Sequence, residues 1–242
     1  VSGYPLHRRQ GPGVMIEMPS PNFDVRQAGC PIDMLVIHYT GMRSAEAAVA
    51  RLCDPESGVS AHYVIDEDGS VIRLVDEGRR AWHAGRAWWR GEADINARSI
   101  GVELVNPGHE FGYRSFPEAQ MSALEDLAQG ILGRQPIARR NVVGHADVAP
   151  RRKCDPGELF DWRRLAGVGV GLWPDAAVSA TPVSATTDLE TLSALLTEIG
   201  YETEDLGATV MAFQRHFRPA RVDGAADVET AGLAAAVLAL CS

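Results

Sequence analysis

The stretch "MLVIHYT" at residues 34–40 decides how the rest of the sequence is interpreted, because it is a short apolar run broken by one histidine. Such a run, rich in β-branched and aliphatic residues, is typical of a strand buried inside an α/β sheet. The segments "SIGVELVN" (99–106) and "NVVGH" (141–145) have the same character. We therefore expect these three segments to be strands of one central sheet.

The segments around these strands complete an α/β pattern. "HYVIDEDGSVIRLV" (62–75) is typical of a β-hairpin that turns at residues 66–70. Helix formers follow a serine cap in "SAEAAVARLCD" (44–54), and apolar residues recur at helical spacing in "PEAQMSALEDLAQGIL" (117–132). The sequence thus predicts an α/β domain with a mixed central β-sheet flanked by helices.

The last quarter of the chain has a different composition. "PDAAVSATPVSATTD" (174–188) is rich in Ala, Ser, Thr and Pro, which is typical of a linker. Three amphipathic stretches follow, at 189–201, 206–217 and 227–240. We predict a catalytic domain over 1–173, a linker over 174–187 and a small all-α three-helix domain over 188–242. A unit of about sixty residues is marginally stable alone.

Charge and composition exclude some classes of function. The net charge is −9, and residues 184–242 hold nine acidic residues against three arginines, so nucleic acid is not expected as a partner. No apolar run is long enough for a transmembrane segment, and the start "VSGYPLHRRQGPG" lacks an apolar signal core. The four widely spaced cysteines leave the redox compartment and a Cys30–Cys53 pair open. The sequence does not fix the oligomeric state.

Two of the seven histidines occupy strand positions that favour a metal site. His38 lies within the first apolar strand, and His145 ends another, where α/β sheets usually bind ligands. A catalytic zinc ion usually takes three protein ligands and keeps a fourth position for water. Cys154 and Asp155 both follow His145 closely, and spacing alone does not choose between them. A buried structural histidine is the alternative for either one taken singly.

The sequence "HAD" also fits half of a two-histidine, one-carboxylate iron site. That interpretation needs a second histidine downstream. The one available is His216, which lies beyond the linker in the small helical unit.

Two charged residues are candidates for acid–base chemistry. Glu103 lies in an otherwise apolar strand, where burying a carboxylate is costly unless it has a partner or a function. It is either a general base facing a metal-bound water or an outward-facing strand residue. Lys153 is either a cation that stabilises an oxyanion or a solvated surface charge.

The segment "RRAWHAGRAWWRGEADINARS" (79–99) is too irregular for a helix. Its three tryptophans, Trp82, Trp88 and Trp89, together with His83, suggest a wall for a ligand with flat or apolar faces, such as sugar rings. The alternative is a loop folded onto the core.

Several motifs occur together and in order over about residues 20–165. They are "SPNFDVR" (20–26), the strand at 34–40, "VSAHYVIDEDG" (59–69), "RAWHAG" (80–85), "SIGVELVN" (99–106) and "GHADVAPRRKCDPGELFDW" (144–162). On these motifs the chain resembles the zinc-dependent N-acetylmuramoyl-L-alanine amidases of the type-2 class, which are related to phage amidases and to peptidoglycan-recognition proteins.

The resemblance implies roles for individual residues. In that family the last zinc ligand directly precedes Pro-Gly, and it is Asp in the bacterial branch and Cys in the phage and animal branches. The metal ligands would thus be His38, His145 and Asp155, with Cys154 in a position usually held by threonine. Glu103 would be the catalytic carboxylate and Lys153 the stabiliser of the tetrahedral intermediate.

The cofactor implied is Zn²⁺ and the substrate is peptidoglycan or a muropeptide. Trp82, His83 and Asn96 are candidates for binding or shaping the substrate cleft. The helical unit, with "FQR" followed by "DGAADVET", is similar to the three-helix peptidoglycan-binding domain and would hold the enzyme on murein.

Two questions of function follow from the resemblance. Some animal relatives keep the fold as non-catalytic peptidoglycan sensors, but they lack the third ligand, which is present here as Asp155. The relatives also divide into envelope enzymes that cut polymeric murein and cytoplasmic recycling enzymes that need a 1,6-anhydro sugar. The binding module favours the periplasm or cell envelope, and the missing signal core favours the cytoplasm.

Overall fold

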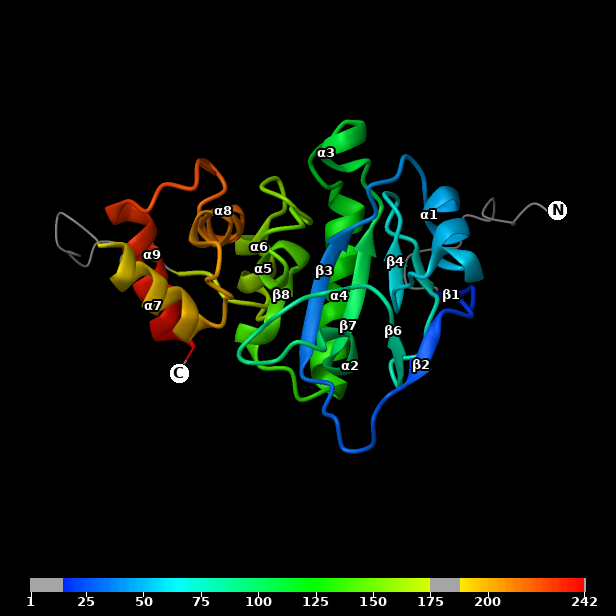
Figure 1. The fold of residues 1–242 in the computed structure, drawn as a ribbon. Coiled ribbons are helices and arrows are strands. Elements are labelled where there is room, and N and C mark those ends of the chain that lie inside the picture. The colour runs from blue at the N-terminus through cyan, green and yellow to red at the C-terminus, as the bar shows by residue number, and fades with distance from the viewer. Residues whose placement is uncertain (1–14, 175–187, 242) are drawn as a thin grey trace.

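The computed structural model describes residues 15–174 and 188–241, and a six-stranded mixed sheet forms the centre of this part of the molecule (Figure 1). The order of the strands across the sheet is β1-β5-β4-β7-β3-β8. Their bounds are β1 Met15–Glu17, β3 Met34–Tyr39, β4 Tyr63–Ile65, β5 Val71–Arg73, β7 Ser99–Leu104 and β8 Val142–Gly144. The mixed sheet predicted from the sequence is therefore confirmed.

The two long central strands place the candidate site residues side by side. Strand β3 pairs in parallel with β7 and with β8, and His38 lies opposite Glu103 in the β3–β7 register. Side chains alternate between the two faces of a strand, so Leu35 and Ile37 point to one face and His38 to the other. The carboxyl ends of β3, β7 and β8 meet at the same edge of the sheet, which is where ligands bind in α/β folds.

Helix α4 (Glu118–Arg134) covers the face of the sheet opposite His38. Its apolar residues, including Met121, Leu124 and Ile131, pack against the inward side chains of β3 and β7. Burial of this face leaves the other face of the same strands for the site.

The remaining elements extend this frame. Helix α1 (Ala45–Leu52) begins at the predicted cap Ser44, whose side chain accepts from the Ala47 amide, and the hairpin turn at 66–70 joins β4 to β5. Strands β2 (Phe23–Val25) and β6 (Arg79–Ala81) form a second, two-stranded sheet. Strands β1, β2 and β6 were not predicted from the sequence, whereas β4, β5 and β8, which are equally short, lie in segments that were.

Short helices connect the strands. They are η1 Pro55–Ser57, α2 Ile95–Arg98, α3 Gly108–Phe111, η2 Arg139–Asn141, α5 His145–Val148 and α6 Trp162–Gly167. The sequence predicted that His145 ends a strand. In the structure, helix α5 follows β8 directly and His145 is the first residue of that helix.

Three helices make up the C-terminal unit, as predicted: α7 (Leu189–Ile199), α8 (Leu206–Phe217) and α9 (Val228–Leu240). Each begins at an aspartate whose carboxylate accepts an amide of the first turn: Asp188, Asp205 and Asp227. We call these helices and their connections, residues 188–241, the helical module. The predicted linker lies almost wholly in residues 175–187, outside the described part.

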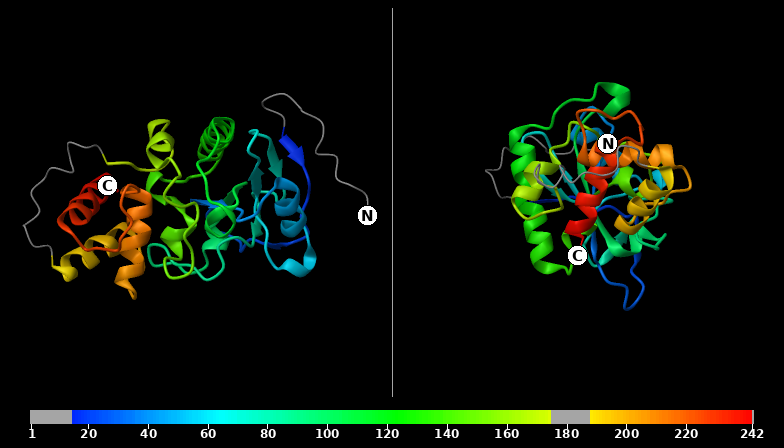
Figure 2. Two further views of the ribbon diagram at one scale, coloured as in Figure 1. Left: turned by 90° about the horizontal axis from the view of Figure 1, so that it is seen from above. Right: turned by 90° about the vertical axis from the view of Figure 1, so that its left-hand side faces the viewer.

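The helical module packs closely on the α/β part and lies at one end of the molecule (Figures 1 and 2). One continuous apolar core joins the two, since Met34, Val36 and Val143 of the sheet belong to the same buried cluster as Leu196 and Phe213 of the module. Among the described residues, no helix combines the length and apolar character needed to cross a membrane.

The "FQR" and "DGAADVET" motifs have a structural role in the module. The Gln214 side chain accepts from the amides of Asp223 and Gly224 and donates to the Ala225 carbonyl, while buried Arg218 pairs with Asp223 and Asp227. These bonds fix the connection between α8 and α9, because a glutamine amide satisfies both donors and acceptors of a loop backbone.

Candidate metal centre

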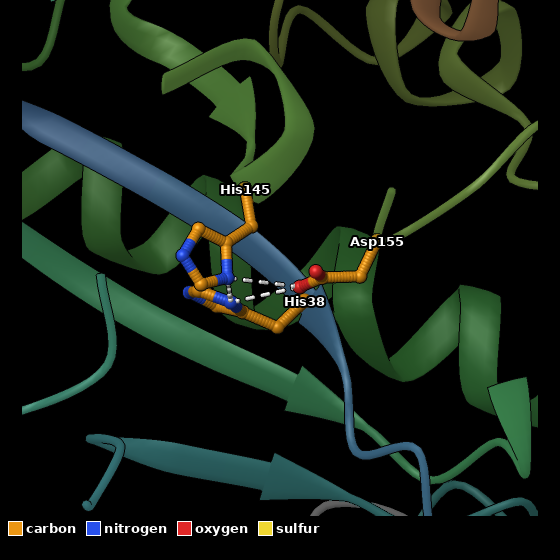
Figure 3. A group of neighbouring side chains, drawn as sticks. All are labelled: His38, His145 and Asp155. Atoms are coloured by element: carbon orange, nitrogen blue, oxygen red, sulfur yellow. Dashed lines mark hydrogen bonds and ion pairs between the residues drawn. The ribbon is translucent and has the colours of Figure 1, made fainter. Parts of the chain in front are cut away.

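Three side chains from distant parts of the sequence converge at the carboxyl edge of the sheet: His38 of β3, His145 of α5 and Asp155 of the following loop (Figure 3). Nδ1 of His38 lies 3.0 Å from Nδ1 of His145 and 3.1 Å from Oδ2 of Asp155, and Nδ1 of His145 lies 3.2 Å from the same oxygen. All three residues are buried.

The tautomer of His38 follows from a chain of hydrogen bonds behind it. The Ser99 hydroxyl donates to the Ile95 carbonyl at 2.6 Å, so it accepts the proton on Nε2 of His83. Nδ1 of His83 then accepts from Nε2 of His38 at 3.0 Å. Burial lowers the pKa of His38 to about 4, so the ring is neutral at pH 7 and Nδ1 presents a lone pair to the site.

His145 is held in the same tautomer from the other side. Its Nε2 lies 2.9 Å from the carbonyl oxygen of Ala84, which can only accept, so Nε2 carries the proton. Nδ1 of a neutral His145 is therefore also a lone pair. Two nitrogen lone pairs and a carboxylate oxygen within about 3 Å of each other repel unless a cation lies between them. The donor set fits zinc, which takes histidine nitrogen and carboxylate oxygen in sites with one open position.

The loop that carries Asp155 is fixed against α5. The Ala146 amide donates to the Asp155 carbonyl at 2.8 Å, and a Cβ on Gly144 would lie 2.7 Å from Pro156. Only glycine leaves room for this contact. Burial acts to raise the pKa of Asp155, but His145 and His38 in their protonated forms hold that pKa well below its usual range. A cation bound between the neutral rings and the carboxylate would act in the same direction. The carboxylate is thus ionised, as a ligand must be.

Glu103 and Lys153 border the same cavity, of about 360 Å³, into which the three converging residues face. Oε2 of Glu103 is buried and has no hydrogen-bond partner within the described residues. Burial raises the pKa of Glu103 well above its usual value, Asp155 adds to this effect and Lys153 opposes it. A carboxyl group in this state is suited to proton transfer.

The structure brings together two of the three residues predicted to shape the substrate cleft. Trp82 and His83 line the cavity, although His83 is largely buried behind His38. Asn96 is not on the cavity wall: its Oδ1 accepts from the amides of His83 and Ala84 at 3.1 and 2.8 Å. Asn96 therefore fixes the backbone of His83 and Ala84. The His83 ring contacts His38, and the Ala84 carbonyl contacts His145.

The predicted wall of three tryptophans is wrong for Trp89. Its side chain is 3% exposed and packs edge-on against Tyr201 of the helical module, with ring centroids 5.0 Å apart. Trp88 is half exposed, and its amide donates to the Val148 carbonyl. For Trp89, the alternative of a loop folded onto the core holds.

Cys154 lies beside the converging residues but not among them. Its Sγ is 3.2 Å from the Tyr39 hydroxyl and 3.5 Å from Nδ1 of His109, whose Nε2 contacts Glu158. Neither His109 nor Glu158 was predicted as a site residue, although Glu158 lies within the motif at 144–162. The other cysteines are free as well, and the thiols of Cys30 and Cys53 point to different backbone carbonyls.

The iron site considered for "HAD" does not form. Asp147 turns away from the cavity and bonds to Tyr201 and His216, which gives it a neighbouring histidine but no part in the converging group. The Asp147 carboxylate therefore belongs to the interface with the helical module.

Comparison with known proteins assigns this geometry to a family. The family model described as "N-acetylmuramoyl-L-alanine amidase" matches residues 28–158, a range that contains His38, His145 and Asp155. The chain belongs to this amidase family. The amidase AmiD of Escherichia coli is 40% identical over 240 residues, which span 88% of this chain and 84% of that protein.

Other relatives match only part of the chain. The 1,6-anhydro-N-acetylmuramyl-L-alanine amidase AmpD of Escherichia coli is 32% identical over 165 residues, 61% of this chain and 88% of AmpD. Over a third of this chain thus has no counterpart in that match.

Two solved structures match most of the chain. AmiD of Escherichia coli, in complex with the substrate anhydro-N-acetylmuramic acid-L-Ala-D-γ-Glu-L-Lys, has a TM-score of 0.80 at 39% identity and covers 88% of this chain and 91% of AmiD. AmpDh3 of Pseudomonas aeruginosa has a TM-score of 0.79 at 32% identity, covering 87% of this chain and 93% of AmpDh3.

Proposed function

We propose that the protein is a zinc-dependent N-acetylmuramoyl-L-alanine amidase. It hydrolyses the amide bond between the lactyl group of N-acetylmuramic acid and the L-alanine of the stem peptide. Family membership and the likeness to AmiD support the amidase activity. The observation that carries the metal is the pair of Nδ1 lone pairs, 3.0 Å apart, facing the Asp155 carboxylate.

In this proposal His38, His145 and Asp155 hold the zinc ion. Bound zinc supplies a Lewis acid that brings the pKa of water near 7. Glu103 takes the proton of the attacking water, and the water oxygen adds to the scissile carbonyl. The ammonium of Lys153, on the same cavity, stabilises the oxyanion of the tetrahedral intermediate. Glu103 then gives the proton to the departing amine of L-alanine.

The environment of Glu103 suits both halves of this cycle. A carboxyl group whose pKa is raised by burial holds a proton more firmly than one in water, so it can return that proton to an amine. The positive charges of Lys153 and of a bound cation lower the pKa again, which keeps the carboxylate able to accept the proton first.

We assign the substrate to peptidoglycan or muropeptides. AmiD is described in complex with an anhydro-muropeptide substrate, and AmpDh3 with anhydromuramic pentapeptide. The helical module, as a peptidoglycan-binding domain, would favour polymeric murein and a place in the periplasm or cell envelope. Recycling of anhydro-muropeptides in the cytoplasm is the alternative.

The test compares wild type, Asp155→Ala and Cys154→Ser on two substrates, a soluble anhydro-muropeptide and intact sacculi. Released peptide with an L-alanine terminus and bound zinc are both measured. We expect wild type to bind about one zinc and cut both substrates, and Asp155→Ala to lose zinc and activity. Cys154→Ser, the matched control at the neighbouring residue, should keep both.

Three results would contradict the proposal in different ways. Zinc retained in Asp155→Ala but lost in Cys154→Ser would make the thiol the ligand. Zinc bound by wild type with binding of sacculi but no cleavage would indicate a non-catalytic sensor of the same fold. Cleavage of the anhydro-muropeptide alone would assign the protein to recycling.

A further inference from the structure

The carboxylate of Asp147 is an acceptor shared by the two parts of the molecule. It is 2% exposed, and three donors surround it. The Gly144 amide donates to Oδ2 at 2.7 Å, Nδ1 of His216 donates to the same oxygen at 2.8 Å, and the Tyr201 hydroxyl donates to Oδ1 at 2.7 Å. A buried carboxylate is costly unless its oxygens are paired in this way.

Asp147 lies on the same four-residue helix as the metal ligand His145. Helix α5 runs from His145 to Val148, and the amide that Asp147 accepts belongs to Gly144, the last residue of β8. A helix of one turn has almost no stability of its own. Its orientation, and with it the direction of the His145 ring, therefore depends on the bonds that Asp147 makes.

Two of the three donors to Asp147 come from the helical module. Tyr201 lies two residues after the end of α7, and its aromatic ring packs edge-on against Trp89. His216 is the penultimate residue of α8, and its ring is stacked between those of Trp162 and Phe217, at 3.8 and 3.9 Å. The packing of their rings thus fixes the positions of both donors to the Asp147 carboxylate.

The segment that contains Trp88 and Arg90 is bonded both to helix α5 and to the helical module. The Trp88 amide donates to the Val148 carbonyl of α5 at 2.7 Å. Two residues later, the Arg90 amide donates to the Gly200 carbonyl at 2.9 Å, and the Arg90 guanidinium donates to the Ile199 carbonyl. Helix α5 therefore touches module-bound backbone on one side and module side chains on the other.

We propose that the helical module positions the metal ligand His145, with Tyr201 and His216 acting through Asp147. This inference rests on the proposed metal site. It gives the module a role beyond holding the enzyme on murein. A substitution where the module contacts Asp147 would change the orientation of His145, and with it the affinity for the metal. Tyr201, His216 and Asp147 are positioning residues, since none of them faces the cavity.

The test uses the full chain and measures zinc affinity by competition with a chelator, together with the visible absorption spectrum of the Co²⁺-substituted protein. Tyr201→Phe removes one hydroxyl and keeps the ring. Residues that orient a metal ligand typically change metal affinity by 10- to 100-fold, and Tyr201 acts one bond further away. We therefore expect affinity to fall by about three- to tenfold, with a shifted Co²⁺ spectrum.

The matched control is Glu202→Gln, which removes the neighbouring ion pair between Glu202 and Arg151 across the same interface. It should leave zinc affinity and the Co²⁺ spectrum unchanged. A double-mutant cycle gives the decisive measurement. If Tyr201 acts through Asp147, then Tyr201→Phe should weaken zinc binding much less in an Asp147→Asn background. If Asp147→Asn does not fold, the cycle is made between Tyr201→Phe and His216→Gln.

An unchanged zinc affinity and Co²⁺ spectrum in Tyr201→Phe would overturn the inference while leaving the metal site intact. Equal weakening by Tyr201→Phe in both backgrounds would overturn it too, because the effect would not pass through Asp147. If wild type itself binds no zinc, the proposed function fails, and this inference fails with it.

Discussion

The two histidines that would bind the metal are held by different regions of the molecule. His38 lies on β3, between two parallel neighbours, and its ring is supported by His83, which belongs to the same α/β part. His145 lies on a single helical turn after an edge strand, and that turn is supported through Asp147 by the helical module.

This difference shows where support is needed. A residue within a paired strand has its backbone fixed by the hydrogen bonds of the sheet, so it needs only a partner for its ring. A residue on one turn of helix also needs its backbone fixed, and here that backbone is held partly from another unit of the chain. We expect substitutions near His38 in the sheet to reduce zinc affinity strongly, and substitutions in the helical module to reduce it less.

The largest effect should come from closing the space behind His38. A Cβ on Gly101 would lie 2.4 Å from the His83 ring, so Gly101→Ala must displace that ring. Nε2 of His38 then loses the acceptor that fixes its tautomer. We expect zinc affinity to fall by about 10- to 100-fold, with a loss of unfolding free energy of about 1–3 kcal/mol. Chelator competition and denaturant unfolding measure the two quantities.

The control for this change is Gly133→Ala in α4, where a Cβ would meet nothing within 4 Å. Alanine is the better helix former, so this variant should be as stable as wild type or slightly more stable. If Gly101→Ala bound zinc as tightly as Gly133→Ala does, the sheet side would not depend on His83.

The buried histidines predict how the zinc-free protein responds to acid. Burial lowers the pKa of His38 and His62 to about 4, from 6.5 in the unfolded chain. Between pH 6.5 and 4 the unfolded state therefore binds protons that the folded state does not, so stability falls as pH falls. The total loss should be on the order of a few kcal/mol.

Denaturant unfolding of the chelator-treated protein at pH 7, 6, 5 and 4 measures this loss. His62→Gln, away from the metal ligands, should make the dependence on pH shallower by one histidine. Equal stability at pH 7 and pH 4 would mean that folding does not lower the pKa of these histidines.

Asn96→Ala tests the segment His83–Ala84, which contacts both proposed histidine ligands. The Asn96 side chain holds the amides of His83 and Ala84, and leaving two buried amides without an acceptor costs about 1–3 kcal/mol. We expect zinc affinity to fall by about tenfold, since the supports of His38 and His145 both shift.

Asn96→Asp keeps an acceptor oxygen in place, so it should recover part of the zinc affinity lost in Asn96→Ala. A role in substrate binding alone predicts a different pattern: Asn96→Ala would raise KM and leave zinc affinity unchanged. Isothermal titration with zinc and steady-state kinetics on the anhydro-muropeptide separate the two.

The smallest effect should come from the module side of the interface. Gly200 has φ +138°, and a Cβ there would lie 2.5 Å from Cγ of Arg90 and 3.1 Å from the ring of Trp89. We expect Gly200→Ala to cost more than about 1 kcal/mol of stability and to weaken zinc binding by about twofold. A loss as large as that of Gly101→Ala would mean that the two histidines are supported equally.

Much of the fold could be predicted because it is local. The strands at 34–40 and 99–106, the cap at Ser44 and the three helices of the module all follow from apolar spacing and capping residues, and the structure has them at these positions. Strand β2 was not predicted, because its three residues are exposed and form no buried apolar run.

The sequence by itself determined the chemistry available at the site. It placed histidine, carboxylate and lysine at strand ends and loops, and its motifs resembled those of an amidase family, to which the chain belongs. From the residues alone, Cys154 and Asp155 were equal candidates, since neighbours in a loop point in different directions.

Only the tertiary structure decided how that site is supported. The burial of Trp89 against Tyr201, the ring of His83 behind His38 and the bonds from the module to Asp147 join residues 45 to 112 positions apart. No local period or short motif encodes such contacts, because they depend on how separately formed elements pack. The same packing brings the helical module, which the sequence predicted as a tethered unit, into direct contact with the helix that carries His145.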